Sequence, residues 1–455
     1  MSYAGRRVLV AGARMAGAAS ARALLAAGAE VTVVDANAMP ALEELAAAGA
    51  RTVVGAGLDL LKEQQDVVVS PGFAPHHPLA AAAVQQGLDV YSEPELAWRL
   101  RGPGAPPWLA ITGTNGKTTT VTMLAAMLAA GGLRTAALGN IGEPLVDAQS
   151  PEKYDVLAVE LSSFQLYWSS RMAPQAGAFL NLADDHLEWH GTREHYIDAK
   201  TNVWRAARAG AGGAVGNRDD ALVAALLGQI AGGIGFTTAG WDPGQFGLVD
   251  GVLVDADGNR IIEAAAIRPP GTHNVANALA AAALARWFGV PLDAVRRGLA
   301  GYVPEPHRNA LVATVDGVAY VDDSKATNPH AAVGSLTAYP RVVWVAGGQL
   351  KGVDPDDLVA TVADRLAGAV LLGVDRGLIR AALARHAPQV PVVEVSTTHD
   401  GAMDEVVRAA AGLAGSGDTV LLAPAAASKD MFASFEARGH AFAAAVRRLG
   451  TQETS

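Results

Sequence analysis

Cysteine is absent from the 455 residues of this chain. Its absence excludes disulfide bonds, catalysis by a thiolate, and any zinc or iron site built from cysteine ligands. Apolar runs long enough to span a membrane, about 18 residues, are also missing. Near the N-terminus, the apolar run at residues 8–11 is too short for a signal peptide. We therefore expect a cytoplasmic protein with no stable membrane insertion.

Basic residues are outnumbered, because 35 Lys and Arg face 45 Asp and Glu, for a net charge of −10. A chain this acidic has no general attraction for nucleic acid or for an anionic membrane. Phosphate binding then requires local sites made of backbone amides and a few basic side chains. Charged residues are 18% of the chain and hydrophobic types 50%, which is typical of a globular protein.

Short β-branched runs alternate with alanine-rich stretches along most of the chain. This alternation predicts an α/β fold of parallel sheets covered by helices. The Gly- and Pro-rich segment at residues 102–107 has the composition of a linker. We expect three domains: an N-terminal Rossmann-like domain at 1–101, a central P-loop ATPase-like domain with a parallel or mixed sheet at 108–302, and a C-terminal Rossmann-like domain at 303–455.

A glycine-rich loop follows the apolar run at residues 108–110 and precedes a helical pattern, with the sequence Ile-Thr-Gly-Thr-Asn-Gly-Lys-Thr-Thr at 111–119. Such a loop presents several N–H groups at a helix N-terminus, and Lys117 adds a full positive charge. The pattern favours a nucleotide triphosphate, with Thr118 placed to meet magnesium. The common ATPase pattern has glycine where this chain has Ile111, so the loop is a shortened variant. A tight turn with an exposed lysine is the alternative, which the order of strand, loop and helix disfavours.

Glu160 ends the apolar strand expected at residues 154–159, on the ligand side of a parallel sheet. If that sheet also carries the glycine loop, Glu160 can reach the magnesium; otherwise it is a solvated loop residue. His186 and His190 are four residues apart, which is compatible with a zinc site, but the His-Glu-x-x-His pattern of such sites is missing. Taken alone, Lys200 has the character of a solvated lysine on a surface helix.

The first domain carries a modified nucleotide-binding pattern, Gly-Ala-Arg-Met-Ala-Gly at residues 12–17. A dinucleotide site requires glycine where Arg14 stands, which disfavours an intact nicotinamide site and favours an altered nucleotide-diphosphate site. Asp35 ends the second expected strand. Ser70 and Gly72 follow another strand, at the edge where ligands of such sheets bind.

In the third domain, polar segments at residues 322–329, 347–352 and 423–428 each follow an expected strand. The nearby Pro-His-Arg segment ends at Arg308. Any one of these segments alone is consistent with ordinary αβ connections. Together they predict one convergent site for phosphate and carboxylate groups.

These motifs together resemble the Mur ligases of peptidoglycan synthesis. The segments that carry the resemblance are GTNGKTT at 113–119, ELSSFQL at 160–166, DDHLEWHG at 184–191, GTHNVANALAAAAL at 271–284, PHR at 306–308 and DDSKATNP at 322–329. They cover nearly the whole chain, and DSKATNP after PHR is the most discriminating. Folylpolyglutamate synthases share GTNGKT but lack a nucleotide-diphosphate domain at the N-terminus. Gln349 stands where some members carry an acidic residue, and Arg14 leaves the uridine diphosphate contacts open.

The resemblance is strongest to the branch that adds glutamate to UDP-N-acetylmuramoyl-L-alanine. It implies an ATP-dependent amide ligase that works through an acyl phosphate, uses two magnesium ions and acts as a monomer. The resemblance implies D-glutamate as the amino acid that is added, and an L-glutamate-adding ligase with nearly the same charges is the alternative. It also implies that Lys200 is carbamylated, which turns a cation into an anionic group fit for a metal.

By the same resemblance, Lys117, Lys200, His186 and Lys325 are the catalytic residues. The expected ATP site is Gly113, Thr114, Asn115, Gly116, Lys117, Thr118, Thr119, Asn277, Arg308 and Asp323. One magnesium is assigned to Thr118 and Glu160 and the second to His186 and Lys200. Asp35, Ser70, Gly72 and Asn140 are expected at the uridine diphosphate substrate. Lys325, Thr327, Lys351, Ser428 and Phe435 are expected at glutamate.

Two other classes of function are weighed against this one. An NAD-dependent dehydrogenase is opposed by Arg14. A non-catalytic nucleotide sensor built on the ligase fold would be expected to have lost Glu160, Lys200 or Lys325, and all three are present.

Overall fold

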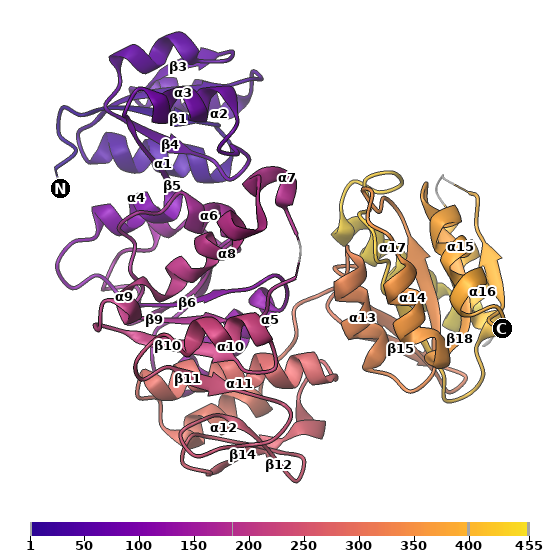
Figure 1. Cartoon of the computed structure of the whole chain (residues 1–455). Helices are drawn as coiled ribbons and strands as arrows, with labels where there is room; N and C mark the ends of the chain where they lie inside the picture. Colours follow the sequence, from indigo (N-terminus) through magenta and orange to yellow (C-terminus); the bar gives the residue numbers. More distant parts are fainter. Residues whose placement is uncertain (1, 184, 398–400, 453–455) are drawn as a thin grey trace. The chain divides into compact units, whose positions relative to one another are not determined.

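The computed structural model describes residues 2–183, 185–397 and 401–452, with side chains up to residue 450 (Figure 1). Two compact units divide the chain. Unit 1 comprises Met1–Ala264 and Ala276–Tyr302, and unit 2 comprises Ala265–Val275 and Val303–Ser455. The finer division into three domains stays a prediction.

The N-terminal part of unit 1 is a parallel sheet in the strand order β3-β2-β1-β4-β5. Its strands are β1 (Arg7–Ala11), β2 (Glu30–Asp35), β3 (Arg51–Val54), β4 (Asp66–Val69) and β5 (Asp89–Ser92). Its helices are α1 (Met15–Ala26), α2 (Pro40–Ala47), α3 (Pro78–Gln85) and α4 (Glu93–Leu100). The strand order reverses beside β1, and ligands of such sheets bind at the carboxyl ends of the strands near that point.

Helices cover both faces of this sheet, as the burial of β1 shows. Val8 and Val10 belong to one apolar cluster with Leu24 of α1, whereas Leu9 belongs to another with Leu79 of α3. Successive side chains of a strand point to opposite faces, so a strand buried on both faces has a continuous apolar run. The N-terminal sheet is therefore doubly wound.

The second sheet of unit 1 has the order β11-β10-β9-β6-β8-β7, and all its pairs are parallel. Its strands are β6 (Trp108–Thr112), β7 (Ala137–Gly139), β8 (Leu157–Glu160), β9 (Ala176–Phe179), β10 (Gly213–Asn217) and β11 (Ile234–Phe236). Its helices are α5 (Lys117–Ala130), α6 (Ser163–Tyr167), α7 (Leu187–His190), α8 (Arg193–Thr201), α9 (Arg205–Arg208) and α10 (Ala221–Leu227). The sheet shared by the glycine loop and Glu160, on which the metal hypothesis depends, is confirmed because β6 pairs directly with β8.

An antiparallel sheet of β12 (Gly247–Val249), β13 (Val252–Val254) and β14 (Arg260–Glu263) follows. The long helix α11 (Thr272–Trp287) comes next, and α12 (Leu292–Ala300) follows it. Within the described parts of the chain, no helix is both long and apolar enough to cross a membrane.

Unit 2 contains a sheet in the order β15-β16-β20-β17-β18-β19. Its strands are β15 (Ala310–Val315), β16 (Val318–Asp322), β17 (Val342–Gly347), β18 (Leu366–Leu372), β19 (Val392–Glu394) and β20 (Thr419–Leu422). Only the pairing of β15 with β16 is antiparallel among these strands. β16, β20 and β17 are therefore adjacent and parallel, so their carboxyl ends meet at one edge of the sheet.

The helices of unit 2 are α13 (Pro329–Thr337), α14 (Asp356–Val362), α15 (Arg376–His386), α16 (Ala402–Leu413) and α17 (Phe435–Gln452). One apolar cluster joins the sheet to α13, α14 and α15, and the other joins it to α16 and α17. The predicted α/β class and the doubly wound character of this part are confirmed.

Candidate active site

The glycine loop connects β6, a central strand, to α5, and the end of β9 holds it in place. Asn181, just after β9, accepts a 3.0 Å hydrogen bond from the amide of Thr114 with its carbonyl oxygen. Its side-chain Oδ1 accepts from the amide of Asn115 over 2.9 Å, and its Nδ2 donates to the Asn115 carbonyl oxygen over 3.1 Å. The loop is therefore fixed before any ligand arrives. Asn181 is a residue of this site that the sequence motifs do not predict.

Gly116 permits the tight entry into α5. Its φ is +83°, a left-handed conformation that favours glycine, and an added Cβ would collide with Oδ1 of Asn277. Asn277 belongs to α11 and was expected at ATP, so the structure brings a predicted ATP residue against the loop. Thr119 is buried in the first turn of α5.

Lys117 folds back over the loop. Its Nζ donates hydrogen bonds to the carbonyl oxygens of Gly113, over 3.0 Å, and Thr114, over 2.9 Å. The ammonium group therefore lies where the loop amides and the N-terminus of α5 also present positive charge. This combination attracts the oxygens of a polyphosphate.

Thr118, Glu160 and Asn140 form an oxygen-rich cluster beside the loop. The Oγ1 of Thr118 donates to Oε2 of Glu160 over 2.7 Å. Asn140, which follows β7, donates from Nδ2 to Oε1 of the same carboxylate over 2.8 Å. Glu160 is buried. Asn140 was expected at the uridine diphosphate substrate, and the structure places it in contact with the expected magnesium ligand.

Lys200 lies in the interior, with 2% of its surface exposed. Its Nζ donates to the Gly113 carbonyl oxygen over 2.7 Å and lies 4.7 Å from the centre of the Tyr196 ring. The interpretation of Lys200 as a solvated surface lysine is wrong, because α8 packs this side chain against the glycine loop. Burial lowers the pKa of Lys200 well below its usual range, the charge of Lys117 lowers it further, and Asp185 and Glu160 act in the opposite direction.

Tyr196 and His190 complete the surroundings of Lys200. The Tyr196 hydroxyl shares a 3.0 Å hydrogen bond with Oγ1 of Thr114, which ties α8 to the loop. His190 packs against Tyr196 with 5.2 Å between ring centroids, and its Nε2 lies 3.0 Å from Oγ of Ser163. Burial, followed by the charge of Lys200, lowers the pKa of His190 to about 4. His190 is therefore neutral at physiological pH.

His186 lies at a φ of +54°, immediately before α7. Its Nε2 is 3.5 Å from Oδ2 of Asp185, and its side chain is 44% exposed, so a ligand can reach it. The ring packs edge-on against Phe164 at 4.7 Å. Asp184 of the DDHLEWHG motif lies outside the described residues. Among those that are described, no three His, Cys, Asp or Glu side chains form a group able to hold a metal ion.

In the N-terminal sheet, Asp35 ends β2 and Ser70 follows β4, the two strands that flank β1. Asp35 accepts from the amide of Ala13 over 2.9 Å through Oδ2, which connects β2 to the loop before α1. The Oγ of Ser70 is buried and makes no hydrogen bond within the described residues. Gly72 is exposed two residues further on, and Arg14 is exposed at the N-cap of α1.

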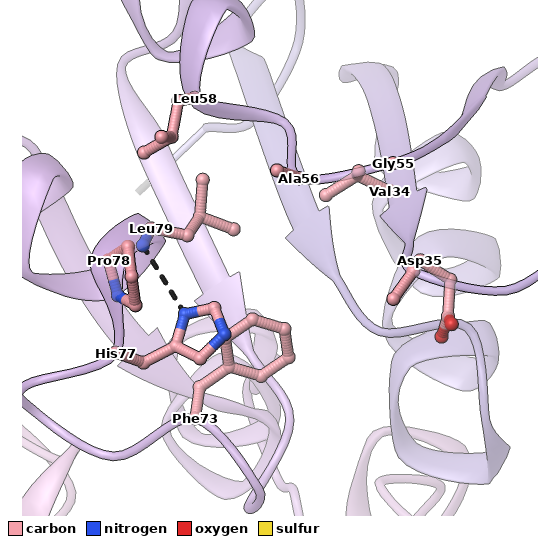
Figure 2. A pocket seen from close by; sticks show the side chains of 10 residues that line it. Val34, Asp35, Gly55, Ala56, Leu58, Phe73, His77, Pro78 and Leu79 are labelled. Atoms are coloured by element: carbon pink, nitrogen blue, oxygen red, sulfur yellow. Dashed lines mark hydrogen bonds between the residues drawn. The ribbon is translucent and has the colours of Figure 1, made fainter.

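A cavity of about 390 Å³ opens beside Asp35. Val34 and Asp35 line one side of it and Phe73 and His77 another (Figure 2). The rings of Phe73 and His77 pack edge-on with 4.5 Å between centroids. This cavity joins an aromatic wall to a carboxylate, which suits a flat, polar ring such as a nucleobase.

In unit 2, the three polar strand-end segments are connected to one another, as expected. The amide of Ala425 donates to the Ala326 carbonyl oxygen over 2.9 Å. Gln349 and Ala427 exchange backbone hydrogen bonds of 2.8 and 2.9 Å. The segments after β16, β17 and β20 therefore form one continuous surface.

The residues expected at glutamate lie on these segments and on the start of α17. Nζ of Lys325 is 4.0 Å from the centre of the Phe435 ring. The amide of Thr327 donates to the Lys325 carbonyl oxygen over 2.8 Å. Ser428 is buried, whereas Lys351 is exposed at a φ of +55°.

Asp323 is a buried carboxyl group next to this surface. Its Oδ1 accepts from the amide of Asn309 over 3.1 Å, and its Oδ2 accepts from the hydroxyl of Ser335. Burial raises the pKa of Asp323 to about 7, although these hydrogen bonds and the charge of Arg308 lower it. Arg308 and Asp323, both expected at ATP, are thus close enough to interact.

The chain matches three family models in the order of the expected domains. These are the Mur ligase MurD-like N-terminal domain at residues 6–92, the Mur ligase middle domain at 111–285, and the Mur ligase glutamate ligase domain at 307–426. Among solved structures, the UDP-N-acetylmuramate-alanine ligase of Thermotoga maritima is 18% identical, covers 99% of this chain and 100% of its own, and superposes with a TM-score of 0.60. This likeness concerns the fold alone.

Relatives with much higher identity extend over nearly the full chain. They are named UDP-N-acetylmuramoylalanine–D-glutamate ligase in Streptomyces avermitilis (51% identical, 99% of each chain), in Thermobifida fusca (52%, 99% of this chain and 100% of the relative) and in Mycolicibacterium smegmatis (46%, 97% of each chain). With the glycine loop, Glu160 and Lys200 assembled as described, these similarities show that the chain belongs to the Mur ligase family.

Proposed function

We propose that the chain joins the free carboxyl group of UDP-N-acetylmuramoyl-L-alanine to the amine of D-glutamate at the expense of ATP. The observation that carries this proposal is the 2.7 Å contact between Thr118 and Glu160 beside the glycine loop. This contact occurs in a chain that is, over 99% of its length, 51% identical to a relative named UDP-N-acetylmuramoylalanine–D-glutamate ligase.

In the first step, the substrate carboxylate attacks the γ-phosphorus of ATP, ADP leaves, and an acyl phosphate forms. Phosphoryl transfer requires in-line positioning and neutralised charge more than covalent help from the protein. Lys117 and the loop amides from Gly113 to Thr119 supply that charge. Asn277 supports the loop at Gly116, and Arg308 and Asp323 complete the proposed ATP contacts.

The oxygen donors near the loop fit magnesium, which prefers hard oxygen ligands and takes its remaining ones from water and phosphate. We assign Thr118 and Glu160 to one ion, and His186 with a carbamylated Lys200 to a second. Bound there, magnesium neutralises charge on the phosphate oxygens. Asn140 orients Glu160 through its 2.8 Å hydrogen bond.

Carbamylation of Lys200 is supported by its surroundings. A neutral amine is the form that attacks carbon dioxide, and burial favours the neutral form of Lys200. The reaction adds the amine nitrogen to the carbon and releases one proton, which leaves an anionic carbamate. This anion would attract Lys117, which the unmodified ammonium repels.

In the second step, the amine of glutamate attacks the acyl carbonyl, and phosphate leaves the tetrahedral intermediate. The carboxylates of glutamate require cationic and hydroxyl partners, which Lys325, Lys351, Thr327 and Ser428 provide. The Phe435 ring borders Lys325 and limits where its ammonium can lie.

For the uridine diphosphate part of the substrate, we assign Asp35, Ser70 and Gly72. The cavity beside Asp35 suits the base, and the buried hydroxyl of Ser70 suits a ligand oxygen. Arg14, exposed at the N-cap of α1, provides a cation for the diphosphate. We further propose that the protein acts as a cytoplasmic monomer.

The test is phosphate release from ATP with UDP-N-acetylmuramoyl-L-alanine and either D- or L-glutamate. Release that depends on D-glutamate supports the proposal. Release with L-glutamate instead identifies the alternative, an L-glutamate-adding ligase with nearly the same charges. No release with either isomer contradicts both.

A further inference from the structure

Arg438 is one of the largest fully buried side chains of the described residues, with 1% of its surface exposed. It lies in the first turn of α17, three residues after Phe435. Neither its burial nor its surroundings can be read from the alanine-rich sequence of this helix. Arginine is seldom fully buried unless its guanidinium has partners, so these partners show what it does.

The guanidinium of Arg438 donates to three separate segments. Nε and Nη2 donate to Oγ and to the carbonyl oxygen of Ser324, each over 2.9 Å. Nη1 donates to the carbonyl oxygens of Gly347, over 3.3 Å, and Ala426, over 3.1 Å. Ser324 follows β16, Gly347 ends β17, and Ala426 follows β20. One side chain thus joins the carboxyl ends of three adjacent parallel strands.

Each of these segments carries a residue proposed to bind glutamate. Lys325 directly follows Ser324, Ser428 comes two residues after Ala426, and Lys351 comes four residues after Gly347. Ser324 also donates from Oγ to the Phe435 carbonyl oxygen over 2.7 Å. Arg438 is therefore connected, through at most four residues of backbone, to most of the proposed glutamate site.

The chemistry of this contact requires arginine. Its hydrogen-bond partners are a hydroxyl and carbonyl oxygens, and no ion pair joins it to a carboxylate within the described residues. Burial lowers the pKa of Arg438 to about 10, so it stays protonated at neutral pH. A planar guanidinium holds several acceptors in fixed directions at once, whereas the compact ammonium of lysine cannot span the same three segments.

We propose that Arg438 is a positioning residue of the glutamate site: by holding Ser324, Gly347 and Ala426 together, it fixes Lys325, Lys351 and Ser428 at the spacing that an amino acid with two carboxylates requires. This inference rests on the proposed function and adds a residue that touches no substrate. It also assigns a positive potential beneath the surface that receives the carboxylates.

The test compares Arg438→Lys and Ser324→Ala with Arg448→Lys in the full-length protein. Arg448 lies on the same helix but pairs with Asp404 at the surface, so it is a matched control. We expect Arg438→Lys to raise KM for D-glutamate about tenfold or more, because small displacements of binding groups are costly. KM for ATP and for the nucleotide substrate should change less than about twofold.

Hydrogen exchange gives a second measurement that needs no turnover. The amides of Lys325, Gln349 and Ala427 are hydrogen-bonded in the three segments, so their exchange reports the opening of each segment. We expect faster exchange at all three in Arg438→Lys and no change in Arg448→Lys. Ser324→Ala should show the same direction with a smaller effect, and decides the question if Arg438→Lys does not fold.

Three outcomes would overturn the inference: an unchanged KM for glutamate, an equal rise in the KM of every substrate, or faster exchange throughout unit 2, which indicates only a structural role. If the unmutated protein shows no turnover with glutamate, the result differs from these three outcomes. It would show that the proposed function is wrong, and the inference would fall with it.

Discussion

Lys117 and Lys200 donate hydrogen bonds to the same atom, the carbonyl oxygen of Gly113, over 3.0 and 2.7 Å. Two lysines that share one acceptor repel each other when both are charged. This repulsion disappears if the buried Lys200 is neutral, and the interaction becomes attractive if Lys200 carries an anionic carbamate. This relationship is the physical basis for the proposed role of Lys200.

Lys200→Ala should abolish turnover, because it removes both the proposed metal ligand and the anion beside Lys117. In the intact protein, ¹³C-labelled bicarbonate should produce one carbamate signal in the ¹³C NMR spectrum, which Lys200→Arg removes. Lys153→Ala, at an exposed lysine paired with Glu143, is the control and should retain full activity. Wild-type turnover in Lys200→Ala would rule out the metal-site role.

Glu160→Gln should reduce the apparent affinity for magnesium by at least about tenfold, because an amide is a much poorer ligand than a carboxylate. The hydrogen bonds to Thr118 and Asn140 can largely persist, so the fold should not change. Titration of activity with magnesium measures the effect. Glu152→Gln is the control, because Glu152 is an exposed carboxylate that accepts a hydrogen bond from Ser150. This variant should behave like the unmutated protein. An unchanged magnesium requirement in Glu160→Gln would contradict the assignment.

Gly116→Ala should prevent ATP binding, since the new Cβ would collide with Asn277. Gly132→Ala is a close control, because Gly132 has the same φ of +83° but no atom within 4 Å of the added Cβ. Both variants carry the backbone penalty of about 1 kcal/mol for a left-handed residue, so only the collision distinguishes them. Calorimetry with an ATP analogue measures the difference, and equal binding by both variants would count against the loop assignment.

Asp323 predicts a pH dependence of stability in unit 2. Its pKa is raised to about 7 in the folded protein, above the unfolded value of about 4. Between these values the folded state holds a proton that the unfolded state has lost. The contribution of protonated Asp323 to the free energy of unfolding is therefore complete below about pH 4, and it is lost as the pH rises towards 7.

Relative to Asp323→Asn, the unfolding free energy of the unmutated protein should fall by up to about 1.4 kcal/mol per pH unit in this window. Urea unfolding monitored by hydrogen exchange in β16 and α13 measures it. Asp364→Asn, at an exposed site, should leave the slope unchanged. An identical slope in Asp323→Asn and the unmutated protein would show that Asp323 is not the titrating group.

The sequence predicted the parts of the site that depend on strand ends. Glu160 was recognised because the carboxyl ends of parallel strands meet at one edge, and β6 and β8 are neighbours. The same rule predicts that the three polar segments of unit 2 meet in one site. Local pattern was sufficient here because β-strand order and ligand position are coupled in α/β sheets.

Residues that act through tertiary packing were not predictable in this way. The sequence around Lys200 predicts a surface residue, and only the resemblance to a family assigns it to the site. Its burial depends on how α8 packs against the glycine loop. Arg438 and Arg448 are likewise indistinguishable by local sequence, although one is buried and the other exposed. The role of Asn181 at the glycine loop becomes visible only when β9 is placed beside β6.

The central claim is that this chain forms an amide between UDP-N-acetylmuramoyl-L-alanine and D-glutamate. Mass spectrometry of the nucleotide product, after incubation with ATP, magnesium and equal amounts of ¹⁵N-labelled D-glutamate and unlabelled L-glutamate, tests it most directly. The account predicts a product heavier than the substrate by one glutamate residue that carries the ¹⁵N label. An unlabelled product, or a nucleotide substrate recovered unchanged, would contradict it.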